Sequence, residues 1–256
     1  NNEEKTTRKP GLISGLLAHW RGLDFILRHP RLIPLILIPV AINILLFLLV
    51  FYLALAHFGD WLNQWLTPAQ AWYWAVLYYL LLLVFLAGLI LAAVFTFTAA
   101  ANILASPFND ALSERTELIV AGAQEKPFSL RAIVKEAGRT VVEELKKILF
   151  FLVVFLILLL FNLIPIAGQL VYGALMTLFT ILWLGLNFLD YAFARHGFRF
   201  GAKIGFVRRN PGAVFGYGLG VFVWLLVPLL NLALIPVAVV GGTLLYLELS
   251  KDESPT

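Results

Sequence analysis

The chain contains no cysteine and few charged residues. None of its 256 residues is cysteine, and Asp, Glu, Lys and Arg together make up 13% of them, against about 25% in an average soluble protein. The absence of thiols excludes disulfides, thiolate nucleophiles and cysteine-ligated metal sites. The shortage of charge excludes an ordinary soluble helical domain, because its helices would need a charged outer face.

Basic residues are absent from three long intervals, 32–114, 148–194 and 210–250. Hydrophobic residues make up 61% of the chain, so we predict that these intervals enter lipid. An excess of Lys and Arg marks the cytoplasmic side of a membrane protein, which places all 19 basic residues there together with both termini. The net charge of +4 then indicates membrane anchoring and no nucleic-acid partner, since the basic residues border hydrophobic segments.

The N-terminal part is predicted to form an interfacial helix at 12–29, after a disordered tail at 1–11. Five apolar side chains share one face of this helix, namely Leu12, Leu16, Trp20, Leu23 and Leu27. Such a stripe is typical of a helix that lies along the membrane surface; the alternative is the polar start of the next membrane helix. Pro30 and Pro34 then interrupt the helix, because proline lacks an amide hydrogen and disfavours helical backbone before it.

Two segments are predicted to be transmembrane helices. Residues 35–56 are apolar and would extend about 33 Å as a helix, enough to cross the bilayer core. Residues 75–101 are longer still and would cross with tilt. The segment between them, 57–74, contains no basic residue but is rich in Trp, which is typical of a membrane interface. We therefore expect 57–74 to be periplasmic.

The second half of the chain has a different pattern. Residues 113–147 are polar, with seven Lys and Arg, and predict a cytoplasmic helical segment, capped by Ser129, that continues into the membrane. Residues 148–189 and 211–247 are predicted to be helical hairpins, each interrupted by a polar apex near Pro165 or Asn231. The first leg, 148–161, would be about 21 Å long, which is short of the core thickness of about 30 Å. Partly inserted (re-entrant) hairpins fit these lengths, and full hairpins in a thin bilayer are the alternative.

No nucleotide-binding loop, zinc-protease motif or nucleophile elbow is present, so we predict neither an enzyme nor a bound cofactor or metal. The four histidines are interpreted as interfacial or turn residues. Gly212, Gly216 and Gly220 recur every four residues, which is the spacing of close helix packing in membranes.

Polar residues at membrane depth are the candidates for a transport route, because they face protein or water and not lipid. The predicted pathway-lining residues are Asn43, Asn102, Asn109, Glu114, Arg115 and Asp190. For the asparagines the alternative is a hydrogen bond between helices. For Glu114, Arg115 and Glu117 a solvated helix start and a charged pore mouth both remain open. Pro107 and its neighbours are expected to interrupt the helix where the chain leaves the bilayer.

Several stretches resemble the CysZ sulfate permease family of bacterial inner membranes, which is related to the etoposide-induced membrane-protein domain. These stretches are 38–46, 104–109, 164–169, 189–193 and 228–238, and they follow the family's order from about residue 12 to 250. The resemblance implies an all-α integral membrane protein of two transmembrane helices plus two partly inserted (re-entrant) helical hairpins. It also implies homo-oligomers and sulfate uptake that supplies cysteine biosynthesis, with sulfite or related oxyanions as further candidates.

The sequence departs from this family in one motif. The family usually has Gly-hydrophobic-Arg-Arg after the proline that ends the first helix, and sulfate binding is associated with that motif. Here Pro30 is followed by Arg31, Leu32, Ile33 and Pro34. We predict that Arg28, Arg31 and the amides of residues 31–33 still bind sulfate, because those amides would lack helical acceptors. The alternative is that both arginines hold lipid phosphates.

The function predicted from the sequence is therefore sulfate uptake across the inner membrane by a channel or a secondary transporter, within a single membrane domain over 1–256. The alternative is a non-transporting membrane scaffold or a bilayer-shaping hairpin protein.

Overall fold

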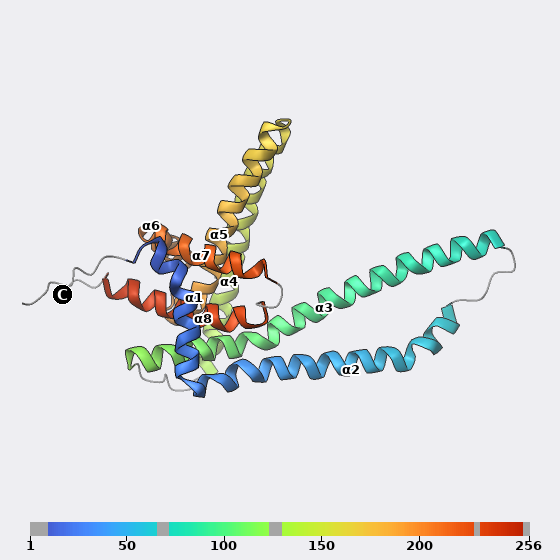
Figure 1. Ribbon diagram of the computed structural model, residues 1–256, viewed down its shortest axis with the longest axis horizontal. Coiled ribbons are helices and arrows are strands. Elements are labelled where there is room, and N and C mark those ends of the chain that lie inside the picture. The colour runs from blue at the N-terminus through green and yellow to red at the C-terminus, as the bar shows by residue number, and fades with distance from the viewer. Residues whose placement is uncertain (1–9, 66–71, 123–129, 228–230, 253–256) are drawn as a thin grey trace, which may run out of the picture. The chain divides into compact units, whose positions relative to one another are not determined.

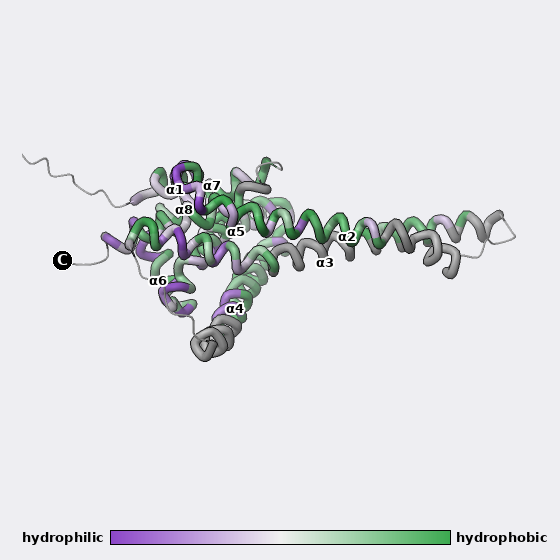
Figure 2. The backbone as a smooth tube through the Cα atoms, turned by 90° about the horizontal axis from the view of Figure 1, so that it is seen from below, coloured by the Kyte–Doolittle hydropathy of each residue, from purple (hydrophilic) through white to green (hydrophobic). Residues whose placement is uncertain are grey.

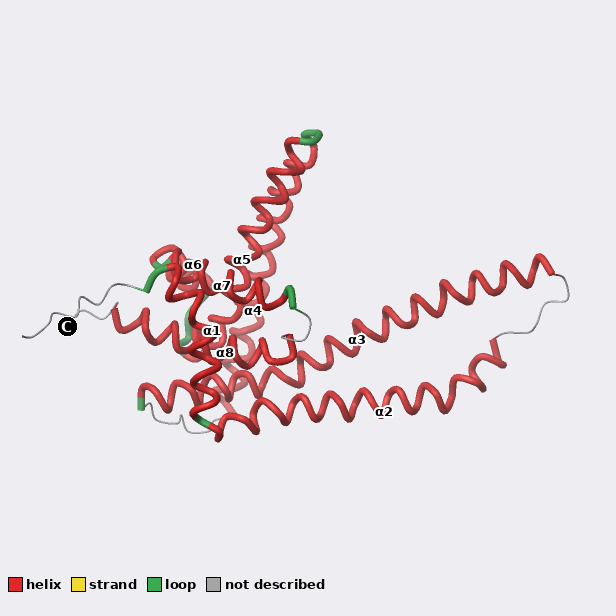
Figure 3. Tube along the Cα trace, viewed as in Figure 1, coloured by secondary structure: helices red, strands yellow, loops and turns green. Residues whose placement is uncertain are grey.

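The computed structural model describes residues 10–65, 72–122, 130–227 and 231–252, and in stretches such as 54–65, 92–103 and 130–141 it describes the backbone only. The described residues form helices joined by turns, with no strand among them (Figure 3). The predicted all-α class is confirmed. The chain packs into two compact units, which we call unit 1 (Asn1–Ile33 with Asn109–Thr256) and unit 2 (Pro34–Phe108). The single membrane domain stays a prediction.

Unit 2 consists of most of α2 (Ile33–Trp65) and the first part of α3 (Trp72–Ala121). The stretch Pro30–Leu53, which includes the start of α2, has a mean hydropathy of 2.9 and is long enough to cross a membrane. Its large apolar side chains are mostly exposed, from Leu37 to Leu53, and Figure 2 shows α2 as hydrophobic over this length. An exposed apolar surface of this extent needs lipid or protein to cover it.

The helix α3 is longer than the sequence predicted. Pro107 was expected to interrupt the chain, but α3 continues through it to Ala121. A proline removes a single amide donor from the helical ladder, and this loss is local. The turns after Pro107 are held by tertiary packing, because Leu112, Ser113 and Thr116 are buried within unit 1. The predicted interruption is therefore wrong, and so is the interpretation of residues 114–117 as a helix start.

Unit 1 is built around α8 (Asn231–Asp252), whose stretch Leu234–Lys251 is mostly buried. Both α1 (Leu12–Arg28) and α5 (Ala167–Arg195) pack against α8 and against α7 (Pro211–Leu225), as Figure 1 shows. The largest buried side chains of this core are Tyr217, Phe193 and Phe206. Tyr217 donates a hydrogen bond from its hydroxyl to the Ala238 carbonyl of α8.

The packed face of α1 is not its apolar stripe. The buried residues of α1 are Gly15, Ala18, His19, Gly22 and Ile26. Trp20 and Leu27 of the predicted stripe are 60% and 70% exposed. Small residues on the packed face let α7 and α8 approach α1 closely. The large apolar side chains such as Trp20 and Leu27 therefore lie on the opposite, outward face. The location of this helix at the membrane surface stays a prediction.

Glycines set the contact between α1 and α7. A Cβ built on Gly216 would lie 2.0 Å from the Leu12 carbonyl oxygen, and one on Gly220 would lie 2.5 Å from Nδ1 of His19. Gly212 faces the Leu12 amide at a wider 3.5 Å. The prediction of close helix packing is confirmed for Gly216 and Gly220, since any side chain at Gly216 would overlap with backbone, whereas Gly212 makes only an ordinary contact.

The first hairpin is formed by α4 (Leu130–Leu159), the 3₁₀ turn η2 (Leu160–Leu163) and α5, which run back alongside each other in Figure 1. Its apex lies at residues 164–166, as the sequence predicted, and Ile166 adopts a positive φ of 60° there. Gly168 fits against the Phe161 carbonyl, where a Cβ would lie only 1.9 Å away. The legs are joined by aromatic contacts such as Phe151 with Trp183, at 5.0 Å between ring centroids.

The second hairpin consists of α7 and α8, with the short helix α6 (Phe200–Arg209) leading into it. Its expected apex at 228–230 lies outside the described residues. Asn231 begins α8, and that helix runs to Asp252, five residues beyond the predicted end of the hairpin. At 15 residues, α7 is about 22 Å long, shorter than the bilayer core. The insertion depth of both hairpins stays a prediction.

Candidate oxyanion turn and polar cluster

The turn between the first two helices is the 3₁₀ segment η1 (Pro30–Leu32). The sequence predicted amides without acceptors here, but the Leu32 amide donates to the His29 carbonyl at 2.9 Å and the Ile33 amide donates to the Pro30 carbonyl. The Leu32 side chain is buried. The prediction that the Leu32 and Ile33 amides are open to an anion is therefore wrong, because the 3₁₀ turn supplies their acceptors.

The two arginines of this turn lie at the surface. The Nε atom of Arg28 is 2.9 Å from an Asp24 carboxylate oxygen one helical turn earlier, and both side chains are well exposed. Arg31 is exposed as well. Exposed pairs of this kind contribute little to stability and exchange readily, so both guanidinium groups are accessible to an external anion.

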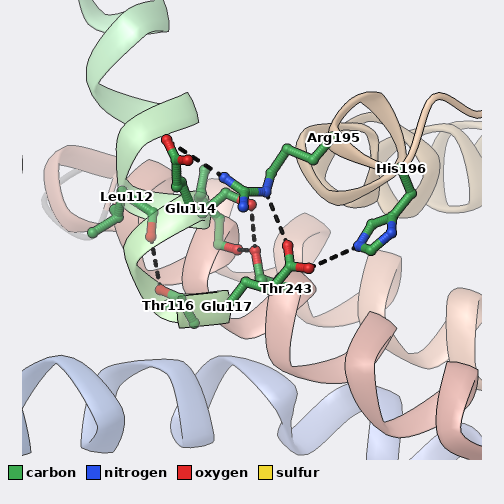
Figure 4. Close-up of polar contacts among 9 residues, drawn as sticks. Leu112, Glu114, Thr116, Glu117, Arg195, His196 and Thr243 are labelled. Carbon is green, nitrogen blue, oxygen red and sulfur yellow. Dashed lines mark hydrogen bonds and ion pairs between the residues drawn. The ribbon is translucent and has the colours of Figure 1, made fainter. Parts of the chain in front are cut away.

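A second group of polar side chains joins the end of α3 to the end of α5 (Figure 4). Arg195 Nε donates to a Glu117 oxygen at 2.9 Å, and Arg195 also lies 3.8 Å from the Glu114 carboxylate. His196 Nε2 is 3.0 Å from the other oxygen of Glu117. Glu117 is buried, so it depends on these two partners for its charge.

Hydroxyl groups continue this arrangement into α8. The hydroxyls of Ser113 and Thr243 are 2.9 Å apart, and Thr243 donates to the Val239 carbonyl. On the next turn of α3, Thr116 donates to the Leu112 carbonyl at 2.8 Å. These groups are fully buried, and their hydrogen bonds meet the requirement that buried polar groups be paired.

A third group surrounds Asp190 on α5. Lys147 Nζ of α4 lies 2.8 Å from Asp190 Oδ2, and Lys203 of α6 is ion-paired with Oδ1. Burial works to lower the pKa of Lys147, but the Asp190 and Glu144 carboxylates outweigh it and raise that pKa. Lys147 therefore remains an ammonium ion at neutral pH.

A neighbouring pair ties α4 to the start of α6. Glu143 accepts a hydrogen bond from the Phe200 amide at 2.7 Å and pairs with Lys146 at 2.8 Å. The hydrogen bonds from Lys146 and from that amide lower the pKa of Glu143.

Asp110 lies on α3 within electrostatic range of Arg195, Asp190 and Glu114. The Asp110 side chain is exposed, but partial desolvation by the surrounding protein raises its pKa, Arg195 opposes that shift, and the Asp190 and Glu114 charges add to it. Asn109 approaches the Tyr191 hydroxyl at 3.5 Å, the outer limit of a hydrogen bond. One end of unit 1 thus gathers acidic, basic and amide groups from α3, α4, α5 and α6.

The structure brings together Asn109, Glu114 and Asp190 of the six predicted pathway residues. Arg115 is exposed at the same end of α3. Asn43 belongs to unit 2 and is half-buried. Asn102 also belongs to unit 2, and its side chain lies outside the described residues.

Several charged residues of this end were missed from the sequence, among them Lys147, Arg195 and Lys203. Lys147 and Arg195 lie near the ends of a hydrophobic tract, Lys203 lies in the basic stretch that follows it, and all three were interpreted only as markers of orientation. The sequence does carry a signal for Lys203. This residue lies one turn from Phe200 and Phe206 on a short helix, which favours its burial. A buried lysine in turn needs a carboxylate partner. His19 was predicted to be an interfacial or turn residue; it lies within α1 and not in a turn, and its side chain is fully buried. Gly220 leaves room for the imidazole, and the depth of His19 in the membrane stays a prediction.

Three of the described helices contain a stretch that is long and apolar enough to cross a membrane, Pro30–Leu53, Ala167–Arg195 and Leu234–Lys251. Across the described ranges, no three His, Asp or Glu residues are grouped to hold a metal ion. The helices, their exposed apolar surface and the buried polar cluster are those of an α-helical membrane protein. Comparison with known proteins then identifies its family.

Residues 18–236 match the family described as sulfate transporter CysZ/etoposide-induced protein 2.4, and the chain belongs to this family. Relatives named sulfate transporter CysZ include one from Pseudomonas paraeruginosa, 33% identical over 92% of this chain and 95% of the relative. Another, from Pseudomonas syringae pv. tomato, is 34% identical over 89% of each chain. A third, from Pectobacterium atrosepticum, is 30% identical over 93% of this chain and 85% of the relative.

Proposed function

We propose that this protein carries sulfate across the bacterial inner membrane and so supplies sulfur for cysteine biosynthesis. The observation that carries the proposal is similarity over nearly the whole length of proteins named for sulfate transport. The buried polar cluster in a helical membrane protein supports transport of a polar solute. The family is one of transporters, and we assign no enzymatic role to the chain.

The transport route is proposed to include Asn109, Glu114, Arg115 and Asp190 of unit 1, with Asn43 and Asn102 of unit 2 as further members. Carboxylates repel sulfate unless a base compensates them. Glu114 and Asp190 meet this condition through Arg195 and through the two lysines. A homo-oligomer of partly inserted hairpins would enclose a path that one chain leaves open.

A sulfate-binding site at the cytoplasmic end of the route is proposed to consist of the Arg28 and Arg31 side chains. Both are exposed, and a guanidinium binds a tetrahedral oxyanion through two parallel hydrogen bonds. Sulfate would displace Asp24 from Arg28, since the exposed ion pair between them is weak. The site then relies on two side chains without amides from Leu32 and Ile33.

The orientation is proposed from the distribution of basic residues, with both termini and 113–147 cytoplasmic and 57–74 periplasmic. The chain has no cysteine, so single cysteines at Asn63 and Gln124 report on topology without background. They should react with a membrane-impermeant thiol reagent from opposite sides. Equal labelling of both from outside would contradict one fixed orientation.

Uptake into vesicles tests the proposed function. Purified protein is reconstituted in liposomes loaded with sulfate-free buffer, and labelled sulfate is added outside at several concentrations. We expect saturable uptake that unlabelled sulfate competes away, and none in liposomes without protein. Sulfite, thiosulfate and molybdate as competitors report selectivity among oxyanions. Uptake equal to that of protein-free liposomes would refute the proposal.

A further inference from the structure

Two lysines from different helices converge on one carboxylate inside unit 1. Lys147 Nζ of α4 is 2.8 Å from Oδ2 of Asp190, and Lys203 Nζ of α6 is ion-paired with Oδ1. The three side chains are only 12%, 6% and 11% exposed in the order Lys147, Lys203 and Asp190. Each oxygen therefore has its own ammonium group, and one negative charge separates two positive charges.

Such a pair of ammonium ions needs an anion between them. Like charges that are partly withdrawn from water repel strongly, and removing the Asp190 charge takes the ion pair from Lys203 and leaves Lys147 with Glu144 alone. Two further carboxylates, Glu143 and Glu144, belong to α4. Glu144 pairs with Lys147 at 2.8 Å, and Glu143 pairs with Lys146 and with the Phe200 amide. The position between Lys147 and Lys203 is the one that Asp190 fills.

We propose that Lys147 and Lys203 form an internal oxyanion site, which Asp190 occupies in this conformation as a tethered competing anion. The inference rests on the proposed function and names a second place, within unit 1, where sulfate is held. A tetrahedral dianion offers each ammonium an oxygen, as the carboxylate does. It also supplies a second negative charge, which a single carboxylate lacks.

The covalent attachment of Asp190 to the chain explains why its carboxylate occupies the site in this conformation. Asp190 is attached to α5, so its effective concentration at the two lysines exceeds that of a freely diffusing anion. Sulfate binds there only when the carboxylate withdraws from the lysines or loses its charge. In the transport cycle Asp190 then acts as a gate that exchanges with the transported ion.

The experiment compares sulfate binding to the purified full-length protein and to Asp190→Asn, by calorimetry in detergent. Asn keeps the shape of the side chain and removes the competing charge. We expect one additional sulfate per chain, bound at least about tenfold more tightly than any sulfate at this place in the parent. The double variant Asp190→Asn with Lys203→Met should not bind this additional sulfate.

Glu144→Gln is the matched control. It removes the same unit of charge from the same cluster and also takes a partner from Lys147, but it leaves Asp190 in place. We expect no additional sulfate site in this variant. A gain as large as that of Asp190→Asn would show a general effect of charge and overturn the inference.

Folding provides the second measurement. Sulfate should raise the unfolding temperature of Asp190→Asn more than that of the parent, because it replaces the missing charge. An Asp190→Asn protein that folds and binds no additional sulfate overturns the inference, and so does one that fails to fold in sulfate-containing buffer. If the parent transports no sulfate but Asp190→Asn gains the site, the proposed function fails and the oxyanion site stands.

Discussion

The buried His19 makes the attachment of α1 sensitive to acid. The imidazole is fully buried, stacks on Tyr217 at 4.8 Å between ring centroids and lies 5.9 Å from the Trp224 ring. Burial is the larger influence and lowers the pKa of His19 from 6.5 to about 4, against a smaller opposite effect of the Leu16 carbonyl. His19 is therefore neutral in the folded protein at neutral pH.

Acid should weaken the contact of α1 with α7 and α8. When α1 is detached, His19 takes up a proton near pH 6.5, whereas in the packed state it does so only near pH 4. The detached state binds more protons between these values, so the stability of the contact is complete above pH 6.5 and falls as the pH drops towards 4. The two pKa values give a loss of about 2 kcal/mol at pH 5, or about a thirtyfold increase in detachment.

Hydrogen exchange of the α1 amides, corrected for the intrinsic dependence of exchange on pH, measures this detachment. The comparison is between the parent and His19→Leu, which removes the titrating group and keeps an apolar side chain of similar size. The other charged groups near α1, notably Asp24 and Glu248, which pairs with Arg21, are the same in both proteins. If both proteins show the same increase from pH 7.5 to pH 5, the reasoning about His19 is refuted.

Three further predictions concern packing, charge and binding. Gly216→Val should destabilise the protein by about 3 kcal/mol or more through overlap with α1, measured as a lower unfolding temperature; the control Gly201→Ala, where a Cβ meets open space, should change stability by less than about 1 kcal/mol. Glu117→Gln should cost about 1–3 kcal/mol because it takes the charged acceptor from the half-buried Arg195 and from His196, and an unchanged unfolding temperature would contradict this. Arg28→Ala combined with Arg31→Ala should bind sulfate about ten- to a hundredfold more weakly by calorimetry, with partial recovery in the double lysine variant; parent-like binding would place the site elsewhere.

Much of the architecture follows from local sequence patterns. Long uncharged tracts predict helices in lipid, because charged groups cannot enter it at low cost. The proline and glycine around Pro165 predict the apex of the first hairpin, which the structure confirms. The spacing of Gly212, Gly216 and Gly220 predicts close packing, since only glycine allows backbones to approach this closely. These signals operate within a few turns of helix and need no knowledge of the neighbouring helices.

The tertiary structure alone decided which side chains meet. The Asp190–Lys147 pair joins residues 43 apart in the chain, and the Arg195–Glu117 pair joins residues 78 apart; no local periodicity encodes either distance. The packed face of α1 could not be predicted from the sequence either. In a membrane protein the apolar face of a helix can turn to lipid while small residues turn inward. The sequence by itself therefore determined that the chain enters the membrane as helices. Only the packing of those helices decided where charge is buried, because each buried charge is stabilised by a partner on another helix.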